Sequence, residues 1–160
     1  MIVRSALTQD ACAICDVWNP LIRDTATTFT TSLRTPDEIL GSIEARAGAY
    51  WVAEVENQII GFATYFPFRS GSGYAHTKEH SVNLAPTARG LGVGRALMET
   101  LELHAKEAGV HSLWAGISAE NPAGVAFHER QNFKHIARLH QVGFKFGRWM
   151  DLVLMQKILT

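Results

Sequence analysis

Three glycines stand at every second position in Arg89-Gly-Leu-Gly-Val-Gly-Arg-Ala96, immediately before an apolar helical pattern. Gly90, Gly92 and Gly94 lack Cβ atoms, so the turn can adopt left-handed conformations and its amide N–H groups can approach an anion closely. The following helix would add unpaired N–H groups and the positive end of its dipole. The spacing fits neither the loop that binds nucleoside triphosphates nor the dinucleotide fingerprint. The segment therefore predicts a site for another phosphate.

A carboxylate stands one predicted strand before this turn. Glu79 lies midway along the strand expected over residues 78–85, where partial desolvation would raise its pKa. Such a group can act as a base toward an amine. Spacing alone leaves a solvent-facing strand carboxylate as an equal alternative. His80 points to the opposite face of the strand, and we expect a structural role for it.

The elements that must position these groups follow a mixed α/β order. Residues 23–35 are rich in threonine and are expected to form a long loop of the kind that carries binding groups. Thr8 is expected to cap the first helix, and Pro36 to open the second. The pattern predicts strands over 2–5, 50–55, 59–66, 78–85, 111–117, 133–145 and 149–157, and helices over 8–21, 36–47, from the glycine turn to 108, and 122–131.

Composition indicates one globular domain over residues 1–160, with 47% hydrophobic and 19% charged residues. Fifteen basic and fifteen acidic side chains cancel, which argues against nucleic acid or an anionic membrane as a partner. No apolar run approaches the roughly 20 residues that span a bilayer, so we expect a cytoplasmic protein. Cys12 and Cys15 are interpreted as buried thiols, and no metal is expected.

Two segments carry a resemblance to a known superfamily. Arg89–Ala96 resembles the Arg/Gln-x-x-Gly-x-Gly/Ala turn with which GNAT N-acetyltransferases hold the pyrophosphate of coenzyme A. Asn121–Phe133 resembles the second cofactor motif of that superfamily, with His128 in place of the usual tyrosine and Asn132 in place of the usual glycine. Asparagine is the residue after glycine that best tolerates a left-handed helix end.

The resemblance extends to one branch of the superfamily. Glu79-His-Ser-Val82 and the tail Val142–Gln156 are similar to the phosphinothricin acetyltransferases, which also acetylate methionine sulfoximine, and the match covers about residues 2–157. It implies an α/β (α+β) GNAT fold: a mixed, mostly antiparallel twisted sheet of about seven strands, flanked by about four helices. It also implies that one strand separates from its neighbour at a bulge beside the acetyl-CoA site. The implied activity is acetyl-CoA-dependent acetylation of the α-amino group of a small amino acid or analogue, by a homodimer.

The resemblance also assigns roles to residues. It favours Glu79 as the base, acting directly or through water, and makes His128 a candidate to protonate the leaving thiolate or to contact the cofactor, although a surface histidine is an equal alternative. Arg69 is our candidate for the substrate's carboxylate or phosphinate, because a guanidinium fork matches a two-oxygen anion; an ordinary exposed arginine is the competing interpretation. Phe29, Thr30 and Tyr74 are expected to line the same pocket, and Trp18, Trp51 and Trp149 to lie in the core. The expected cofactor-binding residues are Asn83, Leu84, Arg89, Gly90, Leu91, Gly92, Val93, Gly94, Arg95, Ala96 and Asn121.

Two other functions stay open. A non-catalytic acyl-CoA-binding sensor would keep the glycine turn and Asn121 but would need no base, so Glu79 favours an enzyme. A GNAT enzyme for a larger amine, such as a protein amino terminus or an aminoglycoside, would be expected to have an extended polar or acidic groove. The near-neutral loop over residues 23–35 argues mildly against that alternative.

Overall fold

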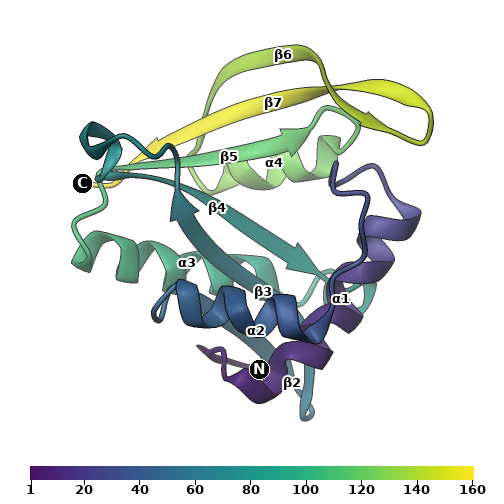
Figure 1. Cartoon of the computed structure of the whole chain (residues 1–160). Helices are drawn as coiled ribbons and strands as arrows, with labels where there is room; N and C mark the ends of the chain where they lie inside the picture. Colours follow the sequence, from purple (N-terminus) through teal and green to yellow (C-terminus); the bar gives the residue numbers. More distant parts are fainter.

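A seven-stranded twisted sheet runs through the molecule in the order β1-β2-β3-β4-β5-β7-β6 (Figure 1). The computed structural model describes residues 1–160. All neighbouring strands are antiparallel except β4 and β5, which are parallel. The strands are β1 (Ile2–Ser5), β2 (Tyr50–Val55), β3 (Gln58–Pro67), β4 (Thr77–Leu84), β5 (Ser112–Ser118), β6 (Lys134–Lys145) and β7 (Arg148–Ile158), and the helices are α1 (Ala11–Asp24), α2 (Pro36–Ala45), α3 (Val93–Glu107) and α4 (Pro122–Arg130). The mixed sheet with four helices predicted from the sequence is confirmed.

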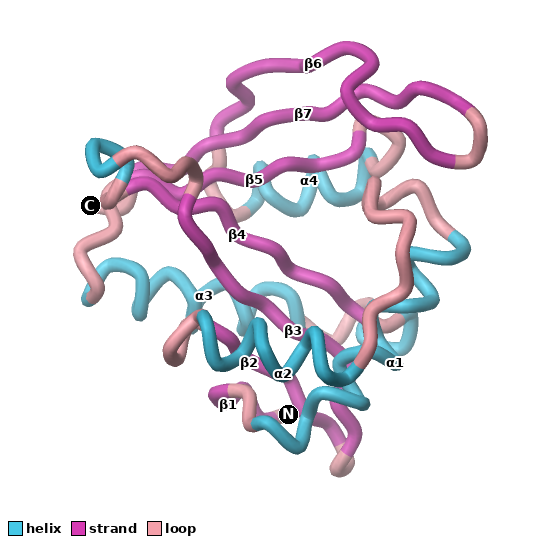
Figure 2. Tube along the Cα trace, in the orientation of Figure 1, coloured by secondary structure: helices cyan, strands magenta, loops and turns pink.

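The helices cover both faces of the sheet (Figures 1 and 2). We call the face under α1 and α2 the front face, and the face under α3 and α4 the rear face. Phe62 of β3 is buried in the front core with side chains of α1 and α2. Its neighbour Ala63 is buried in the rear core with side chains of α3. This alternation follows from the period of two along a strand and leaves both faces available for binding groups.

The sequence predicted the start of α2 correctly but not the start of α1. Pro36 opens α2 as expected, behind a capping box in which Thr35 and Glu38 bond each other's backbone N–H groups. The prediction that Thr8 caps the first helix is wrong. A 3₁₀ turn over residues 8–10 precedes α1, and the Asp10 carboxylate accepts the Leu7 N–H at 2.8 Å.

Two predictions of burial are also wrong. Cys12 is exposed, on the outer side of α1, whereas Cys15 is buried. Trp149 is 59% exposed. It packs against Phe144 near the end of the β6–β7 hairpin, with ring centroids 5.0 Å apart, and Figure 1 shows this end projecting beyond the helices. Trp51, in contrast, is buried as expected. None of the helices is both long enough and apolar enough to cross a membrane.

Candidate active site

The two parallel strands separate halfway along their length. β4 pairs with β5 from Thr77 to His80 only, and the rest of β4 pairs with β3 alone. Beyond Ala115, β5 pairs only with β7. A cleft of about 450 Å³ lies where the strands diverge. The predicted separation of β4 from β5 is confirmed. The bulge expected there is absent, since the β3–β4 register has no shift. Beyond Ala115, β5 stays paired with β7 and diverges from β4.

The cleft passes through the sheet. Glu79 lies opposite Phe66 and Trp114 in the strand register, which places its side chain on the front face. His80 lies opposite Tyr65 and therefore points to the rear. Both residues line the cleft. Front-side walls come from Trp18, Leu21, Thr27, Thr28, Phe29 and Leu152, and rear-side walls from Asn121, Ala123, Gly124, Phe127 and His128.

Glu79 is the carboxylate at the front of the cleft. Desolvation by burial raises its pKa, and no charged neighbour contributes to the shift. A Cβ on Gly116 would lie 3.1 Å from Glu79 Oε1, so glycine at this position leaves room for the carboxylate. Gly116 was not singled out from the sequence, since an isolated glycine in a strand has several explanations. The arrangement gives a partly desolvated carboxylate that still reaches the cleft.

The end of β4 offers an unpaired strand edge to the cleft. Residues 81–84 have no partner on β5, so the backbone groups on that edge are free to bond a ligand. Asn83 and Leu84 line the cleft here, and the Asn83 amide donates to Ser81 Oγ at 2.9 Å. A linear amide-containing ligand could pair with this edge as an added strand does.

The glycine turn forms an anion cradle at the start of α3. Gly90 and Gly92 have φ angles of +76° and +72°, which only glycine adopts easily. Ala96 donates its N–H to the Gly92 carbonyl at 3.0 Å, and Leu91 donates to Ala88 at 3.4 Å. The N–H groups of residues 92–95 have no protein acceptor. They are the unpaired donors of a helix start, where the dipole also favours an anion.

A groove of about 920 Å³ extends from this cradle toward the end of α4. It shares Leu84, Arg89 and Phe127 with the cleft, so the two cavities adjoin. A Cβ on Gly94 would lie 3.1 Å from the Phe127 ring, which explains the third glycine by close packing. The basic side chains that line the groove are Arg89, Arg95, Arg130 and Lys157.

Two of these four cations already have acidic partners. Arg95 pairs with Glu99 at 2.7 Å, and Lys157 pairs with Glu102 at 2.6 Å. Arg89 and Arg130 are in no ion pair, so they are the cations most available to an anionic ligand. Arg130 was missed in the sequence, although it lies within the segment that resembles the second cofactor motif.

The other predicted cofactor residues take different positions. Asn121 lines the cleft and also caps α4, where its Oδ1 accepts the Gly124 N–H at 3.0 Å. Val93 is buried beside the groove. Leu91 and Ala96 line neither cavity.

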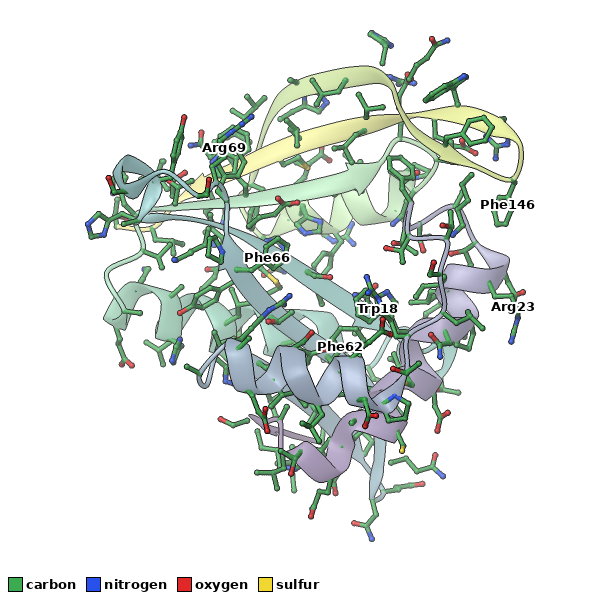
Figure 3. The ribbon with its side chains drawn as sticks, viewed as in Figure 1. Trp18, Arg23, Phe62, Phe66, Arg69 and Phe146 are labelled. Atoms are coloured by element: carbon green, nitrogen blue, oxygen red, sulfur yellow. The ribbon has the colours of Figure 1, made fainter.

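The predicted substrate residues are only partly brought together. Phe29 lines the cleft, whereas Thr30 and Tyr74 do not. Arg69, labelled in Figure 3, lies just beyond β3 and outside the cleft lining. Its guanidinium carbon is 5.7 Å from the centre of the Phe68 ring. Phe68 stacks on Trp114, the cross-strand neighbour of Glu79, so a chain of aromatic contacts connects Arg69 to the front of the cleft.

Two residues of β6 hold the threonine-rich loop in place. The buried Lys145 donates from Nζ to the carbonyls of Thr25 and Thr28, at 2.7 and 2.9 Å. A Cβ on Gly143 would lie 2.5 Å from the Phe29 ring, so glycine is needed there. Sequence reasoning missed both roles, because the contacts join segments more than 100 residues apart. The loop wall of the cleft is thus fixed by the last hairpin.

Comparison with known proteins supports an acyltransfer site. The family model described as "Acetyltransferase (GNAT) family" matches residues 18–133. The chain is 36% identical to the L-amino acid N-acyltransferase MnaT of Escherichia coli strain K12, over 98% of this chain and 92% of that protein. It is 35% identical to the L-methionine sulfoximine/L-methionine sulfone acetyltransferase of Salmonella typhimurium, over 98% of this chain and 93% of that protein.

Solved structures of acetyltransferases have the same fold as this chain. The ribosomal-protein-alanine N-acetyltransferase from Brucella melitensis has a TM-score of 0.95 and 40% identity, covering 99% of this chain and all of that one. The acetyltransferase yncA from Salmonella typhimurium, solved with its cofactor acetyl-CoA, has a TM-score of 0.95 and 35% identity, covering all of this chain and 94% of that one.

Proposed function

The chain belongs to the acetyltransferase (GNAT) family and is an N-acetyltransferase, and we propose that it acetylates the α-amino group of a small amino acid or analogue such as phosphinothricin, methionine sulfoximine or methionine sulfone. One observation carries the proposal. The cleft passes through the sheet, with the Glu79 carboxylate at the front and the anion cradle adjoining the rear. Two substrates entering from opposite faces would meet where the strands separate.

Acetyl-CoA is the co-substrate that fits the rear side. Its pyrophosphate would lie against the free N–H groups of residues 92–95, with Arg89 and Arg130 as the unpaired cations. The pantetheine arm, which contains amides, would follow the open edge of β4 at Asn83 and Leu84. Backbone N–H groups of that edge would then bond the oxyanion that forms at the thioester carbon.

Glu79 supplies the base. An amino acid presents its α-amino group as an ammonium, which must lose a proton before nitrogen can attack the thioester carbon. Glu79 accepts that proton, directly or through one water, and its raised pKa strengthens it for this task. The nitrogen–carbon bond forms, the carbon–sulfur bond breaks, and the electron pair leaves with sulfur toward the rear.

The acceptor's anionic group would lie on the front side of the sheet. Arg69 is in no ion pair and is connected to the position opposite Glu79 through Phe68 and Trp114. A guanidinium there would bind a carboxylate or phosphinate through two parallel hydrogen bonds. Phe29 and Trp18 would surround the apolar part of the substrate.

We also propose that the protein is a cytoplasmic homodimer that associates through the β6–β7 hairpin. Val142, Phe144, Phe146 and Trp149 expose large apolar side chains along this hairpin, with exposed fractions of 51–59%. A second copy would cover them and would lie next to Gly143 and Lys145, which hold the substrate loop. Dimerisation would therefore stabilise the front wall of the cleft.

A second candidate acceptor is the alanine at a protein amino terminus. The observation that favours it is the similarity to the Brucella melitensis enzyme, whose name states that specificity. Both candidates present an α-amino group to Glu79. They differ in the group attached at the α-carbon, because a free amino acid has a carboxylate where a protein has its next peptide bond.

The test is release of coenzyme A thiol from acetyl-CoA with a panel of amines at equal concentrations. The panel contains phosphinothricin, methionine sulfoximine, methionine sulfone, free methionine, a peptide that begins with alanine, and an aminoglycoside. We expect release with the first three compounds. Release with the alanine peptide alone would transfer the proposal to protein amino termini, and binding of acetyl-CoA without release by any amine would overturn it.

A further inference from the structure

Two imidazoles meet at the rear of the cleft. His80 of β4 and His128 of α4 are 5% and 6% exposed, and their Nε2 atoms lie 3.0 Å apart. The rings of Phe127 and Phe133 pack around them, with centroids 5.1–5.3 Å from those of the imidazoles. The contact between the Nε2 atoms is a hydrogen bond only if one of them carries a proton.

The other two nitrogens of the pair face backbone carbonyls. His80 Nδ1 is 3.0 Å from the Trp114 carbonyl oxygen, and His128 Nδ1 is 2.7 Å from that of Gly124. A carbonyl oxygen can only accept, so each Nδ1 must carry a proton for its contact to be a hydrogen bond. Together with the contact between the two rings, the pair needs three protons. Two neutral imidazoles have two, so complete hydrogen bonding requires one imidazole and one imidazolium.

Burial keeps the third proton away from the resting pair. Desolvation and the second imidazole lower the pKa of His80 to about 3, and desolvation also lowers the pKa of His128. At neutral pH the pair therefore has two protons, and in one of its three contacts two lone pairs face each other. The geometry of the pair therefore favours binding of a third proton. A negative charge close to the pair would raise its pKa, so that this proton could bind.

No fixed negative charge of the protein already stabilises a third proton on the pair. Neither pKa is shifted by a carboxylate: besides burial, His128 and the Trp114 carbonyl act on the pKa of His80, and the Gly124 carbonyl acts on that of His128. Glu79 is on the opposite face of β4. The other titratable groups of β4 and α4 are Lys78, on the same face of β4 as His80, and Glu129 and Arg130, which are exposed on α4. Arg89 lines the cleft, and Lys157 of β7, 5.9 Å from the Phe133 ring, is paired with Glu102 of α3.

We propose that His80 and His128 form one proton-binding unit, which takes up a third proton from water as negative charge develops on the sulfur of coenzyme A. His80 is the positioning residue, because its Nε2 holds the Nε2 of His128 at the rear wall of the cleft. His128 Nε2 contacts His80 Nε2 and His128 Nδ1 contacts the Gly124 carbonyl. Because neither nitrogen is available to sulfur, the role of His128 is electrostatic and no proton passes from it to sulfur.

The chemistry of the leaving group supports this role. When the carbon–sulfur bond breaks, its electron pair stays on sulfur, and the thiolate would lie on the side of the sheet where the imidazoles are. A buried imidazole–imidazolium pair stabilises such a charge strongly, because charges interact in a lower effective dielectric there than in water. The inference rests on acetyl-CoA as co-substrate and is independent of which amine is acetylated.

The experiment measures the thiol pKa of bound coenzyme A, from thiolate absorbance against pH, with no amine present. In His80→Gln, the amide can donate to His128 Nε2 without taking up a proton, so the contact between the two side chains is a hydrogen bond in a neutral state. We expect the thiol pKa to be lower in the wild-type protein than in His80→Gln by about one unit, a tenfold change in the thiolate ratio. His104→Gln is the matched control, because His104 bonds Tyr65 at 2.9 Å and lines neither cavity.

Equal thiol pKa values in the wild-type protein and His80→Gln would overturn the proposal. A purely structural histidine would change stability and leave this pKa unmoved. If the variant does not fold, ¹⁵N spectra of the wild-type protein with labelled histidine decide the question. The pair must show two N–H protons in the free protein and three when the bound coenzyme A is the thiolate, at a pH above the pKa of its thiol. Two in both states would contradict the proposal.

Discussion

Glu79 and His80 are neighbours in β4, yet they reach the same cleft from opposite faces of the sheet. The alternation of side chains along a strand separates them. The end of β4–β5 pairing at His80 opens the passage that both then line. In the proposed function, β4 thus presents the base to the amine side and one imidazole of the pair, His80, to the thiol side.

Substitution of Gly92 tests the anion cradle. Gly92→Val forces a β-branched residue to adopt a φ of +72° and should distort the free N–H groups at the start of α3. We expect acetyl-CoA binding to weaken by about tenfold or more, which corresponds to about 1.4 kcal/mol. Calorimetric titration with acetyl-CoA measures the change. Gly48→Val is the matched control, since Gly48 also has a positive φ and open space but does not line the groove. Equal weakening in both variants would contradict the assignment.

Removal of Arg69 tests the carboxylate site. Losing a charge-assisted pair costs about 1.5–3 kcal/mol, so Arg69→Ala should raise the KM for methionine sulfone about 10- to 100-fold and leave acetyl-CoA affinity unchanged. Steady-state kinetics with each substrate varied separate the two effects. The control is Arg23→Ala, because Arg23 is exposed and pairs with its neighbour Asp24. An unchanged KM in Arg69→Ala would assign the carboxylate to another group.

Lys145 should matter for both stability and acceptor binding. Lys145→Met leaves the carbonyls of Thr25 and Thr28 without their buried donor, at a cost of about 1–3 kcal/mol. For a chain of this size, each kcal/mol lowers Tm by about 2–4 °C. We also expect a higher KM for the amine, because the loop carrying Phe29 would loosen. Thermal unfolding and kinetics check both effects, and Lys134→Met on the exposed start of β6 should change neither.

The β6–β7 hairpin predicts the oligomeric state. Trp149→Glu places a charge in the exposed apolar surface and should convert a dimer into a monomer in analytical ultracentrifugation. Leu103→Glu, on the exposed side of α3, should leave the mass unchanged. A wild-type protein that sediments as a monomer at all concentrations would remove the proposed dimer.

The sequence predicted those parts of the molecule that depend on local patterns. The glycine turn was predicted correctly because closely spaced glycines before a helix indicate left-handed backbone conformations. Strand alternation alone placed Glu79 and His80 on opposite faces. Contacts between segments far apart in the sequence could not be predicted from local patterns. Lys145 reaches the Thr25 carbonyl and Gly143 accommodates Phe29 only after the last hairpin folds back over the loop. Trp149 was misplaced for the same reason, since its side chain follows a hairpin that extends beyond the helices.

The central claim is that Glu79 is the base that deprotonates an amino acid acceptor. The most direct measurement is the pH dependence of kcat/KM for methionine sulfone, in the wild-type protein and in Glu79→Gln. Burial raises the Glu79 pKa, so this group is protonated and inactive at low pH, and the wild-type rate should rise as pH increases through that pKa. Glu79→Gln should lose about 100-fold in rate and this rise, with acetyl-CoA affinity retained. The same rate and the same pH profile in both proteins would contradict the account.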